Sequence, residues 1–166
     1  AKAHGARVFV TVGGQDKVDA CLKLGADAAI NYRTEDFVAR TLDLTGGTGA
    51  NVILDMVGGD YIDRNYDAAA VEGRIVQIAF LGGAKASPNF SKLMMKRLHH
   101  TGSTLRPRSV ADKAAMVAAI EAKALPWLAA GRVRPVIDST FPLKDAAQAH
   151  MRMETSQHIG KIVLTV

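Results

Sequence analysis

Gly13, Gly14 and Lys17 are the first residues whose types and spacing could bind a ligand. They follow residues 7–12, an apolar, β-branched run that has the composition of a strand. If this is the second strand of a dinucleotide-binding domain, the small residues leave room for a ribose 2′-phosphate and the ammonium supplies charge to meet it. The pattern therefore favours NADP over NAD. A lysine that simply faces solvent would have the same spacing.

Tyr32 and two arginines are further candidates for ligand contacts. Tyr32 ends the next expected strand, where its ring could lie against an adenine with the hydroxyl near a phosphate. The same position is typical of an ordinary rim residue. Arg106 and Arg108 follow a short edge strand and are either surface charges or anion contacts, and their spacing does not decide between the two.

No set of side chains predicts a nucleophile, an acid–base pair or a metal site. The five histidines lack metal-ligand spacing, and the adjacent His99 and His100 would point in different directions. No Ser-His-Asp set, paired carboxylates or activated cysteine can be assembled from the sequence. Catalytic residues are therefore unknown from the sequence, and no metal is expected.

The composition is that of one ordinary globular domain. The chain has 166 residues, of which 48% are hydrophobic and 22% are charged. Its net charge of +5 comes from scattered basic residues and only 5% of residues are aromatic, so nucleic-acid binding is not expected. No apolar run approaches the length of a membrane span. The single cysteine, Cys21, excludes an internal disulfide and favours a reducing, cytoplasmic compartment.

Residues 51–57 are the stretch around which the other elements are expected to assemble. They are apolar almost throughout and end at Gly58 and Gly59, which predicts a central strand buried on both faces. The glycines indicate either a tight turn or a close approach by backbone or by a ligand. Further strands are expected at residues 7–12, 27–32, 74–80, 101–105, 136–141 and 161–166.

Helix signals lie between these strands. Residues 16–24 should form a helix with Val18, Cys21, Leu22 and Leu24 on its inner side. Thr34 and Ser91 should cap two others. Ser109 should cap a long helix that Pro126 kinks or splits. Helices are also expected at residues 60–70 and 144–154.

The alternation of strands and helices predicts an α/β fold, a Rossmann-like, doubly wound parallel sheet. The fingerprint Gly-x-Gly-x-x-Gly, which normally follows the first strand of such a domain, is absent. The chain begins with Ala1 and is expected to start in mid-domain. We assign residues 1–132 to the sheet domain. Residues 133–166 change in character and are expected to be an appendage to another part of the protein.

Several short segments of the chain are specific when taken together. They are residues 24–27 (LGAD), 30–37 (INYRTEDF), 54–59 (LDMVGG), 73–76 (GRIV), 103–106 (STLR), 141–143 (FPL) with Ala149 and His150, and 158–164 (HIGKIVL). With these segments, nearly the whole chain resembles the medium-chain dehydrogenase/reductase superfamily, specifically its zinc-free quinone oxidoreductase branch.

This resemblance implies a cofactor domain for NADP(H). Lys17 and Tyr32 would contact the 2′-phosphate end, Val57 and Gly58 would flank the dinucleotide, and the loop after Phe80 would approach the nicotinamide, as would the backbone around Leu105. The expected cofactor-binding residues are Gly14, Lys17, Tyr32, Val57, Gly58, Phe80, Leu81, Leu105 and Arg106.

Two positions depart from the family pattern. Many relatives have serine where this chain has Gly14, and a close branch has lysine where this chain has Asp16. One hydroxyl donor is therefore lost and a carboxylate lies nearby, which weakens the expected preference for NADP.

The resemblance also implies a larger parent protein. The first Rossmann strand, its glycine-rich loop and a catalytic domain would precede Ala1, and residues 133–166 would pack on that catalytic domain. The parent would be an NADPH-dependent reductase of quinones or enones that forms a homodimer through the edge strand 101–105, whereas this chain alone would be inactive. The alternatives are a non-catalytic Rossmann-like binding or dimerisation module and, from the pattern alone, another Rossmann-like enzyme such as a methyltransferase.

Overall fold

β1 (Phe9–Val12) and β2 (Ala28–Asn31) form a parallel pair that is connected by α1 (Gln15–Lys23). The computed structural model describes residues 1–166 and confirms this strand–helix–strand unit. The 3-10 helix η1 (Lys2–His4) precedes it and ends at Gly5, whose φ is 83°. The register pairs Val12 with Asn31, so the two strands end side by side.

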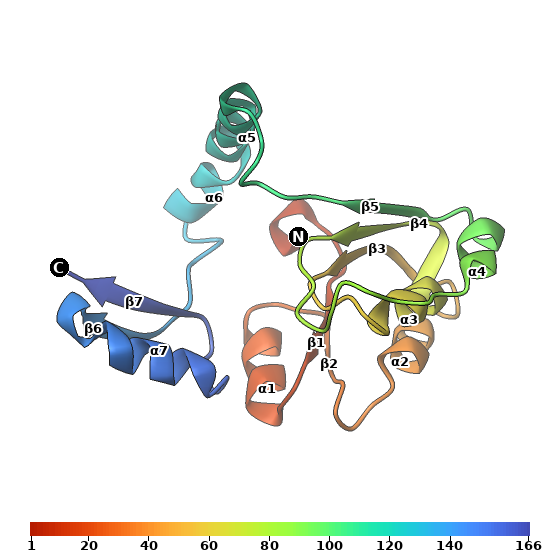
Figure 1. Cartoon of the computed structure of the whole chain (residues 1–166), viewed down its shortest axis with the longest axis horizontal. Coiled ribbons are helices and arrows are strands. Elements are labelled where there is room, and N and C mark those ends of the chain that lie inside the picture. The colour runs from red at the N-terminus through yellow and green to blue at the C-terminus, as the bar shows by residue number, and fades with distance from the viewer.

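β3 (Ala50–Asp55), β4 (Ala69–Gln77) and β5 (His99–Gly102) form a second parallel sheet in the order β3-β4-β5. α2 (Phe37–Leu44) connects β2 to β3, α3 (Tyr61–Ala68) connects β3 to β4, and α4 (Phe90–Met95) connects β4 to β5. α2 and α3 contact each other and lie on one face of the sheet (Figure 1).

One edge of β1 and one edge of β3 are unpaired. β1 pairs only with β2, and β3 pairs only with β4. A Rossmann sheet with the strand order 3-2-1-4-5-6 would place its first strand between these two edges. The pairing is therefore that of a doubly wound sheet that lacks its first strand, as the sequence predicts.

The core lies between the strands and the helices α2 and α3. Tyr66, Ile30 and Ile75 are the largest fully buried side chains. Tyr66 and Ile75 belong to one apolar cluster with Ile62, and Ile30 packs with Phe37 in a second cluster. Burial of these side chains fixes the helices against the sheet.

β3 is not buried on both faces, so this prediction is wrong. Val52 and Leu54 are 63% and 61% exposed, whereas Ile53 packs against both clusters and Asp55 is 4% exposed. Successive side chains of a strand point to opposite faces, and here only the face toward α2 and α3 is covered.

The predicted caps of two helices are also wrong. Asp36 rather than Thr34 caps α2, because its side chain accepts a hydrogen bond from Val38 N. Asn89 rather than Ser91 caps α4 by accepting from Ser91 N. In both cases two residues able to cap lie close together in sequence. The residue that caps is the one whose extended backbone immediately precedes the first helical residue.

The bounds of the later strands and the burial of α1 differ from the predictions as well. β4 begins at Ala69 and ends at Gln77, so residues 78–80 lie beyond it. The edge strand is His99–Gly102 rather than 101–105. Val18 is buried on the inner side of α1, as predicted, whereas Leu22 and Leu24 are exposed, so that part of the prediction is wrong.

The carboxyl-terminal part begins with α5 (Val110–Lys123) and α6 (Leu125–Ala129), which extend away from the sheet (Figure 1). Ser109 caps α5 and Pro126 lies in the first turn of α6, which confirms the predicted cap and split. β6 (Ile137–Pro142), the 3-10 helix η2 (Leu143–Asp145), α7 (Ala146–Glu154) and β7 (Lys161–Thr165) follow. β6 and β7 form a separate parallel pair.

None of the helices in this structure has both the length and the apolar character that a membrane span requires.

The carboxylate of Asp138 holds this terminal unit together. Arg152 donates to both of its oxygens, at 3.1 and 2.9 Å, and Ile159 N donates at 3.0 Å. These bonds join β6 to α7 and to the segment before β7. The Arg152 guanidinium, followed by the Ile159 N–H, holds the pKa of Asp138 well below its ordinary value.

We predict that Asp138→Asn loosens the terminal unit. A carboxylate whose pKa is lowered by folding stabilises the folded state above its unfolded pKa of about 4, and this contribution is lost as the pH falls toward the folded pKa. Amide hydrogen exchange in β7 should therefore be faster in the variant at neutral pH, and the difference from wild type should shrink in acid. Asp43→Asn, which removes the partner of Arg40 in an exposed pair within α2, is the control and should change little. Equal protection of β7 in wild type and Asp138→Asn would contradict the prediction.

Candidate functional site

The turn after β3 is organised by the buried side chain of Asp55. Its Oδ1 accepts hydrogen bonds from Val57 N at 2.6 Å and from Gly58 N at 3.2 Å. Its Oδ2 accepts from Asn65 Nδ2 at 3.0 Å, which connects the turn to α3. The predicted residues Val57 and Gly58 are therefore fixed at the carboxyl end of β3, where ligands bind in open α/β sheets.

The loop after β4 is hydrogen-bonded to this turn. Leu81 N donates to Met56 O at 3.0 Å, Gly82 N to Val57 O at 2.7 Å, and Gly59 N to Gly83 O at 2.8 Å. Two segments that are distant in sequence thus form one surface. The structure brings together Val57, Gly58, Phe80 and Leu81, four of the residues that the resemblance assigns to cofactor binding.

Gly58 is required where these two loops meet. Its φ is 70°, and a Cβ at this position would lie 2.7 Å from Gly83 O and 2.7 Å from Phe80 Cδ1. A side chain would therefore meet both an unfavourable backbone conformation and a collision with backbone. The glycine permits the close approach that the sequence pattern indicated.

A pocket of about 350 Å³ opens at the carboxyl ends of β4 and β5. Gln77 lies at its wall: its Nε2 donates to Ala79 O at 2.6 Å, whereas its buried Oε1 has no hydrogen-bond partner. His100, from β5, shares a 2.9 Å hydrogen bond through Nδ1 with the Tyr66 hydroxyl. The pocket is lined by Ile62, Gln77, Phe80, His100, Thr101 and Gly102.

Sequence reasoning did not identify Gln77 or His100 as site residues. The only signal was a polar glutamine inside the otherwise apolar run 75–80, and this signal does not distinguish a site from a structural hydrogen bond. His100 lacks metal-ligand spacing and carries no other sequence signal. Its position depends on β4–β5 pairing, which places it opposite Ile75.

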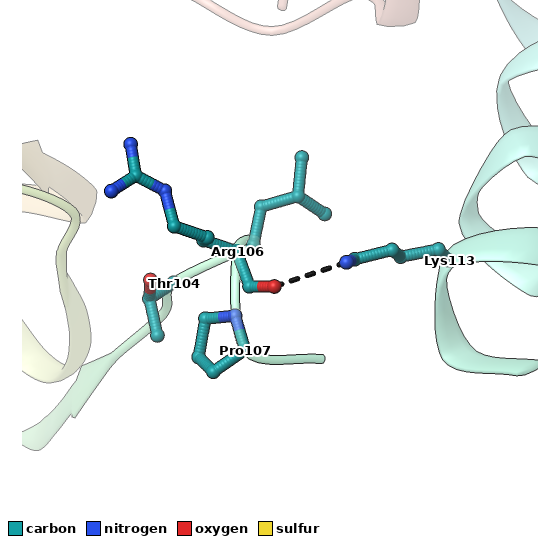
Figure 2. Close-up of a pocket in the computed structure, with 5 residues that line it drawn as sticks. Thr104, Arg106, Pro107 and Lys113 are labelled. Atoms are coloured by element: carbon teal, nitrogen blue, oxygen red, sulfur yellow. Dashed lines mark hydrogen bonds between the residues drawn. The ribbon is translucent and has the colours of Figure 1, made fainter. Parts of the chain in front are cut away.

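The segment after β5 surrounds a second, open pocket of about 680 Å³ (Figure 2). Lys113 Nζ donates to Arg106 O at 3.0 Å, and the Arg106 guanidinium points away from that contact. Arg108 instead binds its own loop, with Nε donating to Thr104 O at 3.0 Å. Of the two arginines that spacing left equivalent, Arg106 lines the pocket and Arg108 has a structural role. Leu105 also lines this pocket.

The remaining predicted residues lie at the carboxyl ends of β1 and β2. The Tyr32 hydroxyl lies over Gly13, only 2.6 Å from where a Cβ on that glycine would be. A Cβ on Gly14 would lie 2.6 Å from Asp16 Oδ1. The Lys17 ammonium does not point freely into solvent, because it donates to Ser156 O at 2.5 Å.

The predicted site therefore consists of three clusters rather than one. Each lies at the carboxyl ends of parallel strands: the first beyond β1 and β2, the second beyond β3 and β4, and the third beyond β5. No hydrogen bond joins the first cluster to the second. No group of three or more His, Cys, Asp or Glu side chains is arranged to hold a metal ion.

Comparison with known proteins matches this chain to dehydrogenases. A family model described as zinc-binding dehydrogenase matches residues 24–164. Quinone oxidoreductase 1 of Escherichia coli is 34% identical over 167 residues, which cover 99% of this chain and 50% of that protein. The 2-haloacrylate reductase of a Burkholderia species is 32% identical over 174 residues, covering 99% of this chain and 49% of that protein. The chain spans about half the length of the curated relatives it matches.

Solved structures show the same similarity. The Escherichia coli quinone oxidoreductase complexed with NADPH superposes with a TM-score of 0.82 and is 31% identical, covering 99% of this chain and 51% of that one. An NAD-dependent alcohol dehydrogenase superposes with a TM-score of 0.80 and is 32% identical, covering 100% of this chain and 46% of that one. These two proteins are described with different nicotinamide cofactors, so similarity alone does not choose between NADP and NAD.

We predict that Gly58→Ala damages the junction of the two loops. The positive φ should cost about 1 kcal/mol, and the collision with Gly83 O a further 1–3 kcal/mol or so. Gly46→Ala is a matched control, because its φ is 60° but nothing lies within 4 Å of the new Cβ. Urea unfolding should show a larger loss for Gly58→Ala than for Gly46→Ala. Equal losses would show that the contact with the β4 loop is not a constraint.

Proposed function

The chain belongs to the zinc-binding dehydrogenase family of the medium-chain dehydrogenase/reductase superfamily, and we propose that it forms most of the cofactor domain of an NADPH-dependent quinone or enone reductase. The observation that carries this proposal is the junction of the loops after β3 and β4, which places Val57, Gly58, Phe80 and Leu81 on one surface at the carboxyl ends of the strands. The NADPH complex of the Escherichia coli relative supports the choice of cofactor.

The residues at the three clusters fit NADP(H). Gly13 and Gly58 are close-approach positions, where a Cβ would fall within 3 Å of neighbouring atoms. The first cluster supplies a phenol and an ammonium, which suits the 2′-phosphate end, and Gly14, Lys17 and Tyr32 are proposed to bind there. The orphaned Oε1 of Gln77 offers an acceptor at the pocket beside β5. Leu105 and Arg106 are proposed to contact the nicotinamide end.

The proposed role of this chain in the reaction is positioning. When bound, NADPH supplies the hydride that a quinone or an α,β-unsaturated carbonyl accepts. Val57 and Gly58, held by Asp55, would orient the dinucleotide, and the Phe80–Leu81 loop would limit access of water to the nicotinamide end. Alignment of donor and acceptor alone supplies a large part of the rate in such transfers. We propose that this branch uses no zinc.

We further propose that residues 1–132 are a dinucleotide-binding domain completed by a strand between β1 and β3. Both facing edges are unpaired, and a strand followed by a glycine-rich loop would supply the phosphate-binding amides that this chain lacks. Residues 133–166 are proposed to pack on the catalytic domain. The chain alone would then bind NADPH poorly and reduce nothing.

A non-catalytic binding or dimerisation module is the second candidate. It is favoured by one observation, the unpaired outer edge of β5. We propose a homodimer through this edge in either case, since an unpaired strand is a template for another chain. Turnover of a quinone with NADPH by the complete protein would separate the two candidates.

We predict that Lys17→Glu in the complete protein lowers activity with NADPH much more than activity with NADH. The substitution replaces a cation by a carboxylate beside the proposed 2′-phosphate site, so kcat/KM for NADPH should fall by about 100-fold or more while that for NADH changes little. Quinone-dependent loss of the reduced nicotinamide absorbance measures both. An equal fall for both cofactors would remove Lys17 from cofactor choice, and a wild type without quinone-dependent turnover would remove the reductase proposal.

We predict that Gly102→Pro prevents dimerisation. Ser103 N donates to Gln77 O at 2.9 Å, so the preceding amide of Gly102 faces away from β4 toward the free edge. Proline there removes a donor from the edge but leaves β4–β5 pairing intact. Sedimentation at about 10 μM, where specific interfaces normally hold, should show a wild-type dimer and a variant monomer. Ser103→Pro is the contrasting variant, because it breaks the bond to β4 and should lower stability. A monomeric wild type or a dimeric Gly102→Pro would contradict the proposal.

A further inference from the structure

Two side chains from the turn after β2 lie over Gly13. A Cβ on Gly13 would be 2.6 Å from the Tyr32 hydroxyl and 3.3 Å from Arg33 Nε. The parallel register that pairs Val12 with Asn31 brings these two turns together. Arg33 was not among the residues predicted from the sequence, although it follows Tyr32 directly.

The backbone that carries Arg33 is fixed by local hydrogen bonds. Arg33 N donates to Asn31 Oδ1 at 3.1 Å, and Glu35 N donates to Asn31 O at 2.9 Å. Asn31 N in turn donates to Glu35 Oε1 at 3.0 Å. The turn is therefore held at both ends, and the arginine side chain starts from a defined position beside Gly13.

The guanidinium of Arg33 has no acceptor in the structure. It forms no hydrogen bond or salt bridge, whereas the neighbouring carboxylates of Glu35 and Asp36 lie against Arg40 and Arg64. Lys17, the other cation of this cluster, already donates to Ser156 O. Of the two cations in this cluster, only Arg33 has all of its side-chain hydrogen-bond donors unused.

We propose that Arg33 is a specificity-determining residue, whose guanidinium binds the 2′-phosphate of NADPH together with the Tyr32 hydroxyl and Lys17. This inference rests on the proposed function and deepens it at the same site. A guanidinium can donate two parallel hydrogen bonds to a phosphate, which an ammonium cannot. The cluster also contains Asp16, which lies close to Gly14 and would repel an anion. A second cation in the cluster, beside Gly13, would offset that carboxylate.

The test measures binding to the complete protein by titration calorimetry, so that it does not depend on turnover. The probes are NADPH, NADH and adenosine 2′,5′-bisphosphate, and the variant is Arg33→Met. We expect NADPH and the bisphosphate to bind about 10- to 100-fold more weakly, the scale of one or two charge-assisted hydrogen bonds, with NADH changed by less than about 3-fold. Arg33→Lys should give an intermediate loss, because it keeps the charge and loses the paired geometry.

Lys23→Met is the matched control. It likewise removes one positive charge, but from the carboxyl end of α1, about 12 Å along the axis from the start of this nine-residue helix, where Gly14 and Lys17 lie. It should leave all three affinities unchanged, which excludes an effect of net charge alone.

The outcomes separate this inference from the function on which it rests. A wild type that prefers NADPH, with Arg33→Met unaffected, would overturn the role of Arg33 and leave the proposed cofactor intact. Equal losses for NADPH and NADH would show that Arg33 shapes the site generally, which also overturns the inference. A wild type that binds NADH as tightly as NADPH would overturn both the inference and the proposed cofactor.

Discussion

The buried carboxylate of Asp55 is the interaction on which the geometry of the strand ends depends. A carboxylate removed from water is costly unless it is hydrogen-bonded, and here the amides of Val57 and Gly58 and the side chain of Asn65 satisfy it. These bonds define how the chain leaves β3. They thereby place Gly58 where it can meet the loop after β4, and the surface proposed to carry a dinucleotide exists only because the two loops meet.

Much of the fold follows from local patterns in the sequence. The β-branched apolar runs gave strands at β1, β3 and β7, Ser109 caps α5, and Pro126 separates α5 from α6. Such features act within a few residues, so the sequence shows them directly. The placement of the predicted site at strand ends follows from the parallel alternation of strands and helices, which aligns all carboxyl ends on one side.

The remainder depends on contacts between distant residues. The exposure of Val52 and Leu54 could not be predicted, because an apolar run does not reveal which layers cover a strand. An exposed arginine such as Arg33 has no periodic signal, and its relation to Gly13 arises only from strand pairing. The unpartnered Oε1 of Gln77 likewise becomes visible only when its surroundings are known.

The contact between Lys17 and Ser156 O joins residues 139 positions apart in the chain. A carbonyl oxygen and a phosphate oxygen can both accept from this ammonium, which has three protons. An anion that draws Lys17 away from Ser156 would weaken its hold on the segment after α7, and a firmer hold on that segment would weaken binding of the anion by the same factor. The occupancy of one end of the sheet and the anchoring of the last strand pair are, in this sense, a single reciprocal equilibrium.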